Sequence, residues 1–356
     1  GVVYEGRTEL MDEDKIQFVQ KTEQRTLREV IAGADVFLGL SVKGAVTPDM
    51  VRAMAAHPII FAMANPDPEI TPPDAKAVHP DAIVATTSLD DAFAFSQMYV
   101  LAIPAQEIRA TLEAWKNRFP SDCTIVSTLK GIEAKTQLRM TEVVTEILGI
   151  PPARLGLITG PNLAGELSLR QPAGAVAASS NTEISQLMID AFTTPYFRIY
   201  PSEDLVGCEL AGAAKSVIAL AVGMAIGLDL GENTQAMIIT RGLSEVARFG
   251  NGYGANPLTN LGLAGMGDLV ASCGSGLSRN RTFGEALGRS GTMSQARLEV
   301  AKTVEGVASA PAILELAHRV GVEVPIIEVV ADVVGDRISP SAAMTRLMTV
   351  SMAAEL

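Results

Sequence analysis

The sequence predicts an α/β protein in which a Rossmann-like parallel sheet is followed by an all-helical C-terminal domain. From about Ala34 to Tyr200, short apolar runs that end in turn residues alternate with longer segments of helical period. Runs that are apolar on both faces are typical of a parallel sheet covered by helices. After Gly207 the strand-like runs stop and helix-forming segments follow one another. Because the 356 residues exceed the size at which a single core stops growing, two or more domains are expected.

Six apolar runs are the expected strands, and helical periodicity between them completes the β-α-β alternation. The strands are expected at residues 34–40, 58–64, 82–85, 98–103, 124–127 and 155–158, with intervening helices such as 107–119 and 136–148. In the second half, helices are expected at 208–226, 234–249, 308–320, 326–335 and 341–348. Glycines stand where these helices should end and prolines where new ones should begin.

The charge balance restricts the partners of the chain. The formal net charge is −12, with 48% apolar and 19% charged residues. An acidic protein of this kind is not expected to bind nucleic acid or an anionic membrane surface, because those partners require a basic field. An anionic substrate would therefore need a local cationic pocket.

Cysteine and histidine are too few and too scattered for a disulfide framework or a metal site. Cys123, Cys208 and Cys273 form no CxxC pair, and the three histidines stand apart from other metal ligands. This pattern favours a reducing cytoplasm and no metal. The most apolar stretch, residues 216–228, is too short to cross a bilayer, so we expect a buried core helix and no membrane insertion.

One lysine, Lys215, lies in a segment of small apolar residues, 207–219, with the sequence GCELAGAAKSVIA. Small residues allow other groups to approach closely, so this lysine would be partly desolvated. Desolvation lowers the pKa of an amine toward the range in which it exchanges a proton near neutral pH. The alternative is a lysine that extends from a core helix to solvent.

A glycine-rich segment with a single carboxylate follows, and a short polar segment comes after it. These segments are GLAGMGDL at 262–269 and LSRNR at 277–281. Asp268 can orient a lysine or a substrate hydroxyl, and the Arg279 guanidinium beside Ser278 and Asn280 matches the geometry of a phosphate. The alternative is a loop in which Asp268 caps a helix. The three glycines are not a dinucleotide-binding turn, because their order is wrong and no strand precedes them.

Two upstream segments, STLKGIE at 127–133 and TGPNLAGE at 159–166, each follow an expected strand. Ligands bind at the carboxyl ends of the strands in an open parallel sheet. Lys130, Gly160 and Asn162 are therefore candidate site residues.

Taken together, these segments resemble bacterial NAD(P)-dependent glycerol-3-phosphate dehydrogenase over about residues 85–348. The matching motifs, in the order of that family, are KGIE at 130–133, GPNxAxE at 160–166, Lys215, Asp268, SRNR at 278–281 and VEGV at 304–307. The resemblance implies interconversion of sn-glycerol 3-phosphate and dihydroxyacetone phosphate with NAD or NADP, feeding phospholipid synthesis. It also implies a small phosphorylated substrate and a homodimer.

The resemblance further implies a role for each matching residue. Lys215 would accept the hydroxyl proton in oxidation, while Lys130 and Asp268 would orient the reacting group. The substrate phosphate would lie against Ser278, Arg279 and Asn280, with Gly160 and Asn162 lining the site. Contacts to the cofactor would come from Lys130, Ala164, Arg279 and Glu305. The sequence departs from the family at Ser216, where an asparagine usually follows the catalytic lysine.

Residues 1–85 resemble a different family, the NAD(P)-binding domain of bacterial malic enzyme. The matching segments are GVVYEGR at 1–7, GADVFLGLS at 33–41 and FAMANPDPEI at 61–70. The lysine and the metal-binding acids of malate decarboxylation are absent. Asn65 would approach a nicotinamide or, alternatively, only end a strand in a turn with Pro66.

The chain as a whole therefore resembles a fusion of parts from two dehydrogenases. It contains no strand–GxGxxG–helix unit, which in this fold binds the pyrophosphate. The expected domains are 1–85, a malic-enzyme-like part of a dinucleotide-binding sheet; 86–200, the remainder of that sheet; and 201–356, a helical substrate-binding domain. Alternatives to a competent dehydrogenase are a chain impaired in cofactor binding and, less favoured, malate oxidation.

Overall fold

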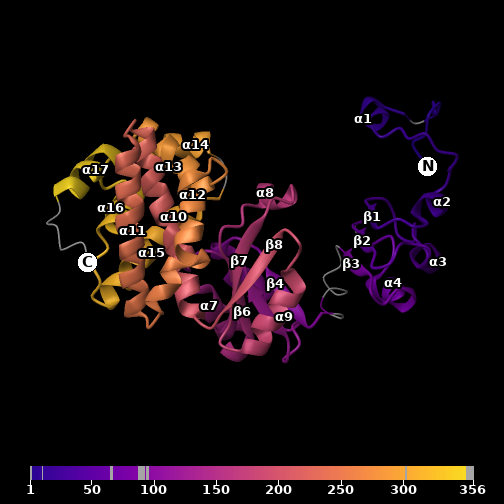
Figure 1. Cartoon of the computed structure of the whole chain (residues 1–356), viewed down its shortest axis with the longest axis horizontal. Coiled ribbons are helices and arrows are strands. Elements are labelled where there is room, and N and C mark those ends of the chain that lie inside the picture. The colour runs from indigo at the N-terminus through magenta and orange to yellow at the C-terminus, as the bar shows by residue number, and fades with distance from the viewer. Residues whose placement is uncertain are drawn as a thin grey trace. The chain divides into compact units, whose positions relative to one another are not determined.

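The structure, a computed structural model, describes residues 2–9, 11–64, 67–86, 93, 96–300 and 303–349. The internal contacts of the chain divide it into two units, Gly1–Ser96 and Gln97–Leu356. Figure 1 shows a small three-stranded unit, and a larger unit in which a sheet adjoins a layer of long helices.

The N-terminal unit is a short parallel sheet with small helices. Strands β1 (Val36–Gly39), β2 (Ile59–Ala62) and β3 (Ile83–Thr86) are parallel and lie in the order β1-β2-β3. The helices are α1 (Glu13–Ile16), α2 (Leu27–Ile31), α3 (Pro48–Arg52) and α4 (Pro72–Val78). The side chains of Thr26, Thr47 and Thr71 cap α2, α3 and α4, and a proline opens each of the last two.

One face of this small sheet is buried and the other is exposed. Phe37 and Ile60 lie in a core, whereas Val36, Leu38 and Ile83 are 53%, 64% and 62% exposed. Among the described strands, β1, β2 and β3 are hydrogen-bonded only to one another. The described strands of the segment that resembles malic enzyme thus pair with one another in one three-stranded parallel sheet.

The larger unit begins with a five-stranded sheet of order β4-β5-β6-β7-β8. The strands are β4 (Met98–Leu101), β5 (Thr124–Ser127), β6 (Leu155–Thr159), β7 (Ala173–Ala178) and β8 (Phe197–Ser202). All neighbours are parallel except β6 and β7, which are antiparallel. The connection between these two strands, residues 160–172, contains the five-residue α8 (Ala164–Ser168).

Helices cover both faces of this sheet. On one face, α6 (Ile108–Trp115) and α7 (Met140–Leu148) bury Leu112 and Val143 in a cluster that includes Ile125. On the other face, α9 (Thr182–Phe192) buries Met188 in a cluster with Val126. Short 3₁₀ turns, η1 (Ala105–Glu107) and η2 (Pro152–Arg154), precede α6 and β6. The predicted Rossmann-like sheet is confirmed, with the one antiparallel pairing as the exception.

Only helices are described after β8, as predicted. They are α10 (Leu205–Gly227), α11 (Glu232–Gly252), α12 (Asp268–Gly274), α13 (Arg279–Ser290), α14 (Met293–Glu299), α15 (Glu305–Arg319), α16 (Pro325–Val334) and α17 (Pro340–Thr349). A 3₁₀ turn, η3 (Pro257–Leu261), and a π turn, η4 (Leu263–Gly267), lead into α12. The three helices α12 to α14 lie between residues 268 and 299, where no helix was named from the sequence.

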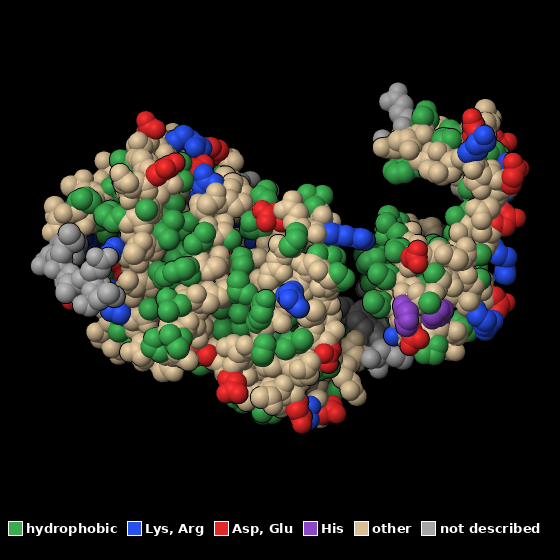
Figure 2. Space-filling model, in the orientation of Figure 1, with side chains coloured by type: hydrophobic (Ala, Val, Ile, Leu, Met, Phe, Trp, Pro, Cys, Tyr) green, Lys and Arg blue, Asp and Glu red, His purple; other side chains and the backbone are tan. Residues whose placement is uncertain are grey.

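The long helix α10 is the centre of the helical layer. It is apolar and long enough to cross a membrane by length and composition, yet 89% of its most apolar window is buried inside the protein. This burial confirms the expected core helix, although the 23-residue helix is longer than the stretch 216–228 that was judged too short to cross a bilayer. Figure 2 shows that the visible surface around the helices carries many apolar side chains, with the charged ones dispersed among them.

Candidate functional site

Four segments that are distant in sequence meet where the carboxyl ends of two strands face α10. Lys130 follows β5, Gly160 follows β6, Lys215 lies within α10 and Asp268 is the first residue of α12. The turn at Gly160 requires glycine: its φ is +136°, and a Cβ there would lie 3.0 Å from the Cα of Ala175. The ends of β5 and β6 therefore bring Lys130 and Gly160 to one edge of the sheet, as in other open parallel sheets, and α10 and α12 supply Lys215 and Asp268 there.

Asp268 is bonded to both lysines. The Nζ of Lys130 donates to Oδ2 of Asp268 at 2.6 Å, and the Nζ of Lys215 donates to Oδ1 at 3.0 Å. Lys130 also donates to the carbonyl oxygen of Gly160 and to Oδ1 of Asn162, each at 3.0 Å. The structure thus brings together five of the residues singled out from the sequence.

This cluster has more positive than negative charge and is shielded from solvent. The side chains of Lys215 and Asp268 are 10% and 4% exposed, and that of Lys130 is 19% exposed. Burial, together with the nearby charge of Lys215, lowers the pKa of Lys130 to about 8, against the opposing effect of Asp268. Two ammonium groups beside one carboxylate form a local cationic pocket in an otherwise acidic protein.

Ser272 belongs to the cluster but was not singled out from the sequence. Its Oγ accepts from Nζ of Lys215 at 2.6 Å and is itself buried. Ser272 stands four residues after Asp268, so the two side chains share one face of α12. A helix predicted over residues 268–274 would have placed Ser272 beside Asp268, but no helix was named there from the sequence.

The segment 278–280 begins α13. Ser278 is its N-cap and accepts from the backbone N–H of Arg281 at 3.4 Å, and Arg279 is the first helical residue. Oδ1 of Asn280 accepts from the N–H of Gly306 at 2.9 Å. Arg279 is exposed and forms no ion pair within the part of the chain that the structure describes. Its guanidinium is therefore free to bind an anion.

Glu305 begins α15 and holds one carboxylate oxygen without a partner. Its Oε1 accepts from the N–H of Ala105 at 3.2 Å, whereas the buried Oε2 has no hydrogen bond. Burial raises the pKa of Glu305, while the Ala105 N–H and the charge of Arg279 act in the opposite direction. The buried hydroxyl of Ser309, one turn later, is also unpartnered. Unused polar atoms of this kind fit a site that receives a polar ligand.

The remaining predicted residues are placed as follows. Ala164 is exposed at the first position of α8. Asn65 and Pro66 lie outside the described residues. Within the described ranges, no group of three or more His, Cys, Asp or Glu side chains could hold a metal ion.

Comparisons with known proteins agree with this geometry. Two of the three matching family models are the N-terminus of NAD-dependent glycerol-3-phosphate dehydrogenase, at residues 74–185, and its C-terminus, at 204–345. A protein of Frankia casuarinae named glycerol-3-phosphate dehydrogenase [NAD(P)+] is 43% identical over 300 residues, which cover 84% of this chain and 89% of the relative. This chain belongs to the NAD(P)-dependent glycerol-3-phosphate dehydrogenase family.

Further relatives in the glycerol-3-phosphate dehydrogenase family support the assignment. A Corynebacterium glutamicum protein of the same name is 47% identical over 252 residues, covering 70% of this chain and 76% of the relative. The crystal structure of glycerol-3-phosphate dehydrogenase from Coxiella burnetii matches with a TM-score of 0.72 at 26% identity, covering 90% of this chain and 99% of that one. The N-terminal resemblance is also confirmed, because the model of the malic enzyme NAD-binding domain matches residues 1–98.

Proposed function

We propose that this chain interconverts sn-glycerol 3-phosphate and dihydroxyacetone phosphate with NAD(H) or NADP(H). The observation that carries the proposal is the shared carboxylate of Asp268, which is bonded to Lys130 and Lys215 at the strand ends. Membership of the glycerol-3-phosphate dehydrogenase family supports the same substrate pair. An acidic protein needs a local cationic site to bind an anionic substrate, and the two lysines form such a site.

Lys215 is the proposed proton-transfer residue. In oxidation, the hydroxyl proton of the substrate passes to Nζ of Lys215 as the C2–H bond breaks and a carbonyl forms. In reduction, the Lys215 ammonium returns that proton to the oxygen. Hydride transfer at C2 is the chemistry that a bound nicotinamide supplies. Ser272 and Asp268 keep the Lys215 Nζ in place through bonds of 2.6 and 3.0 Å.

Lys130 and Asp268 are proposed to orient the reacting oxygen, and the start of α13 to hold the phosphate. Arg279 supplies a planar guanidinium with several N–H donors, which suits phosphate oxygens better than a point charge does. Ser278 and Asn280 flank it in the sequence, and Gly160 and Asn162, which both accept from Lys130, are proposed to line the site as well.

For the cofactor, we propose contacts from Lys130, Ala164, Arg279 and Glu305. The unpartnered Oε2 of Glu305 is suited to accept a hydrogen bond from the cofactor.

The proposal includes a cytoplasmic location. All three cysteines are free and buried, as expected of a chain that works in the cytoplasm. A homodimer is part of the same proposal.

The experiment that tests this function measures reduction of dihydroxyacetone phosphate by NADH and by NADPH, in the parent and in Lys215→Met. The variant keeps a similar side-chain volume but loses the proton-transfer group, so turnover should fall about 10²–10⁴-fold. Circular dichroism and the unfolding midpoint show whether the variant is folded.

Three outcomes would contradict the proposal. A folded Lys215→Met variant that stays within roughly tenfold of the parent would remove the role of this lysine. A folded parent that binds cofactor but reduces no dihydroxyacetone phosphate would remove the substrate assignment. Cofactor-dependent oxidation of malate in place of glycerol 3-phosphate would favour the malic enzyme alternative.

A further inference from the structure

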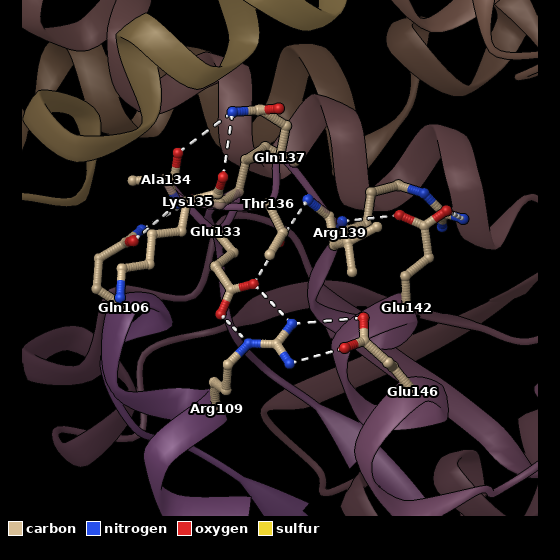
Figure 3. A network of polar contacts seen from close by, with 12 residues as sticks. Gln106, Arg109, Glu133, Ala134, Lys135, Thr136, Gln137, Arg139, Glu142 and Glu146 are labelled. Atoms are coloured by element: carbon tan, nitrogen blue, oxygen red, sulfur yellow. Dashed lines mark hydrogen bonds and ion pairs between the residues drawn. The ribbon is translucent and has the colours of Figure 1, made fainter.

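The loop that carries Lys130 is held by two side chains from the helical turn beside it. Gln106, in η1, donates from Nε2 to the carbonyl oxygen of Ile132 at 2.8 Å, and its Oε1 accepts from the N–H of Ala134 at 2.9 Å. Arg109, in α6, donates from Nε and Nη2 to the two carboxylate oxygens of Glu133, each at 2.9 Å. Figure 3 shows both side chains reaching the loop from the same turn.

Of the two ion pairs that Arg109 forms, the one with Glu133 is the more buried. The side chain of Glu133 is 7% exposed, whereas that of Glu146, the second partner of Arg109, is 53% exposed. The Arg109 guanidinium is the main cause that lowers the pKa of Glu133, although burial opposes it, and the Thr136 hydroxyl adds to the effect. A buried ion pair with two parallel hydrogen bonds holds both side chains in one orientation. A solvent-exposed ion pair stabilises that orientation much less.

The same turn also touches the residue proposed to contact the cofactor. The N–H of Ala105 donates to Oε1 of Glu305 at 3.2 Å, one residue before Gln106. Segment 105–109 therefore contacts both the Lys130 loop and the first turn of α15. A displacement of segment 105–109 would therefore move both the Lys130 loop and the first turn of α15.

We propose that Gln106, Arg109 and Glu133, here called the brace, are positioning residues that hold the Lys130 ammonium against Asp268. Glu133 stands three residues after Lys130, and the N–H of Glu133 donates to the carbonyl oxygen of Leu138 at 3.0 Å, so the brace acts on a closed loop. Lys130 has a long flexible side chain, so the position of its Nζ depends on how firmly the loop backbone is held. Misplacement of a group by about 1 Å costs up to about 100-fold in rate. This inference rests on the proposed function, in which Lys130 orients the reacting group.

The test compares Glu133→Gln and Gln106→Ala with the matched control Glu146→Gln. Glu133→Gln removes the buried partner of Arg109, and Glu146→Gln removes the exposed partner of the same guanidinium. Gln106→Ala releases the loop without leaving a buried charge, so it stays informative if Glu133→Gln fails to fold. We expect kcat to fall about 10- to 100-fold in both brace variants, with KM for dihydroxyacetone phosphate within about threefold of the parent. The control should stay within about twofold of the parent in both constants.

A second readout does not depend on turnover. Competitive acetylation at a series of pH values, followed by mass spectrometry of the peptide that contains Lys130, gives the pKa of this amine. Release of the loop should raise that pKa from about 8 toward the value of a solvated lysine, about 10.4, in both brace variants and not in the control. A role in stability alone would lower the unfolding midpoint and leave this pKa unchanged.

The outcomes separate the brace from the proposed function. If the parent reduces no dihydroxyacetone phosphate, the proposed function fails, and the acetylation data still decide the brace. If both brace variants keep the kcat and the Lys130 pKa of the parent, the brace is overturned. A fall in kcat with an unshifted Lys130 pKa would also overturn the brace. An equal fall in kcat in the control Glu146→Gln would overturn it too.

Discussion

At the scale of single residues, the site depends on one carboxylate that serves two amines. Asp268 accepts from Lys130 and Lys215 through its two oxygens. Since one negative charge cannot compensate two buried positive charges, one amine must lose its proton more easily than it does in water. The pKa of Lys130, lowered to about 8 by burial and by Lys215, shows this effect.

We predict that kcat/KM for dihydroxyacetone phosphate falls above about pH 8, roughly tenfold per pH unit. Below this pKa, Lys130 is an ammonium group that can donate to the substrate oxygen. As pH rises through it, the lysine becomes neutral and loses that charge-assisted bond. The ratio kcat/KM is the correct quantity because it reports groups in the free enzyme.

Lys130→Arg is the control for this profile. A guanidinium stays protonated throughout the range, so the variant should have no decline near pH 8, whatever its absolute rate. A parent profile that stays flat to about pH 9.5 would contradict the prediction. A decline that persists in the variant would assign it to another group.

The sequence predicted the principal charged residues of this site but not how they are held. Lys215 was singled out as a charge in a helix of small residues, Lys130 because it follows an expected strand, and Asp268 as the carboxylate of a glycine-rich segment. Ser272 and Gln106 are ordinary polar residues in helical turns, and nothing in their neighbours distinguishes them. Their contacts, to Lys215 and to the backbone of the Lys130 loop, depend on elements that only the fold brings together.

At the scale of elements, α10 and α13 approach each other through two pairs of glycines. A Cβ at Gly223 would lie 2.1 Å from the carbonyl oxygen of Arg281, and one at Gly284 would lie 2.3 Å from that of Leu220. Gly227 and Gly288, one turn further along each helix, are equally close to the opposite backbone. The two backbones are thus in direct contact, and α10 carries Lys215 while α13 carries Arg279.

We predict that Gly284→Ala destabilises the protein by about 1–3 kcal/mol, because the added methyl group meets backbone that cannot move alone. Alanine is more favourable than glycine in a helix by roughly 0.5–1 kcal/mol. A net decrease in the free energy of unfolding would therefore come from the steric clash. Urea unfolding gives the free energy of unfolding for parent and variant. Gly274→Ala is the matched control, since a Cβ at this helical glycine has nothing within 4 Å. Equal stability of the two variants would contradict the prediction.

Helices and strands whose apolar residues recur with a clear period were predicted from the sequence, and those without such a period were missed. Strand β5 was predicted at residues 124–127, which are its bounds in the structure. Strand β7, with the sequence AGAVAA, is too rich in alanine and glycine to have a strand signal, although the sheet buries most of it. Helices α12 and α13 contain or follow glycines that indicate turns, but in α13 these glycines serve close packing.

At the scale of the whole molecule, the chain joins two sheets with different ancestry. The malic enzyme model covers residues 1–98, and the dehydrogenase models cover 74–185 and 204–345. The described strands follow this division, with one sheet of three strands and one of five. The sequence indicated both families, but it could not reveal that each set of strands would pair within itself, because pairing depends on contacts that periodicity does not encode.

This organisation leads to a prediction about cofactor affinity. The 356-residue chain contains no strand–GxGxxG–helix unit, whose backbone N–H groups and helix N-terminus normally bind the pyrophosphate. Of the cations at the proposed site, Lys130 and Lys215 are bonded to Asp268. Arg279 remains available, but it is also the proposed ligand of the substrate phosphate. Among the described residues of the proposed site, the pyrophosphate would then compete with the substrate phosphate for Arg279 or stay hydrated.

We therefore predict that the chain binds NADH and NADPH at least about 100-fold more weakly than a family member that contains the glycine turn. Each lost charge-assisted hydrogen bond costs about 1.5–3 kcal/mol, and every 1.4 kcal/mol is about tenfold in affinity. Calorimetric titration of both proteins with both cofactors under the same conditions measures the difference. Glycerol 3-phosphate, titrated separately, controls for an intact substrate site. Low-micromolar cofactor binding by this chain would contradict the prediction, because some other group must then bind the pyrophosphate.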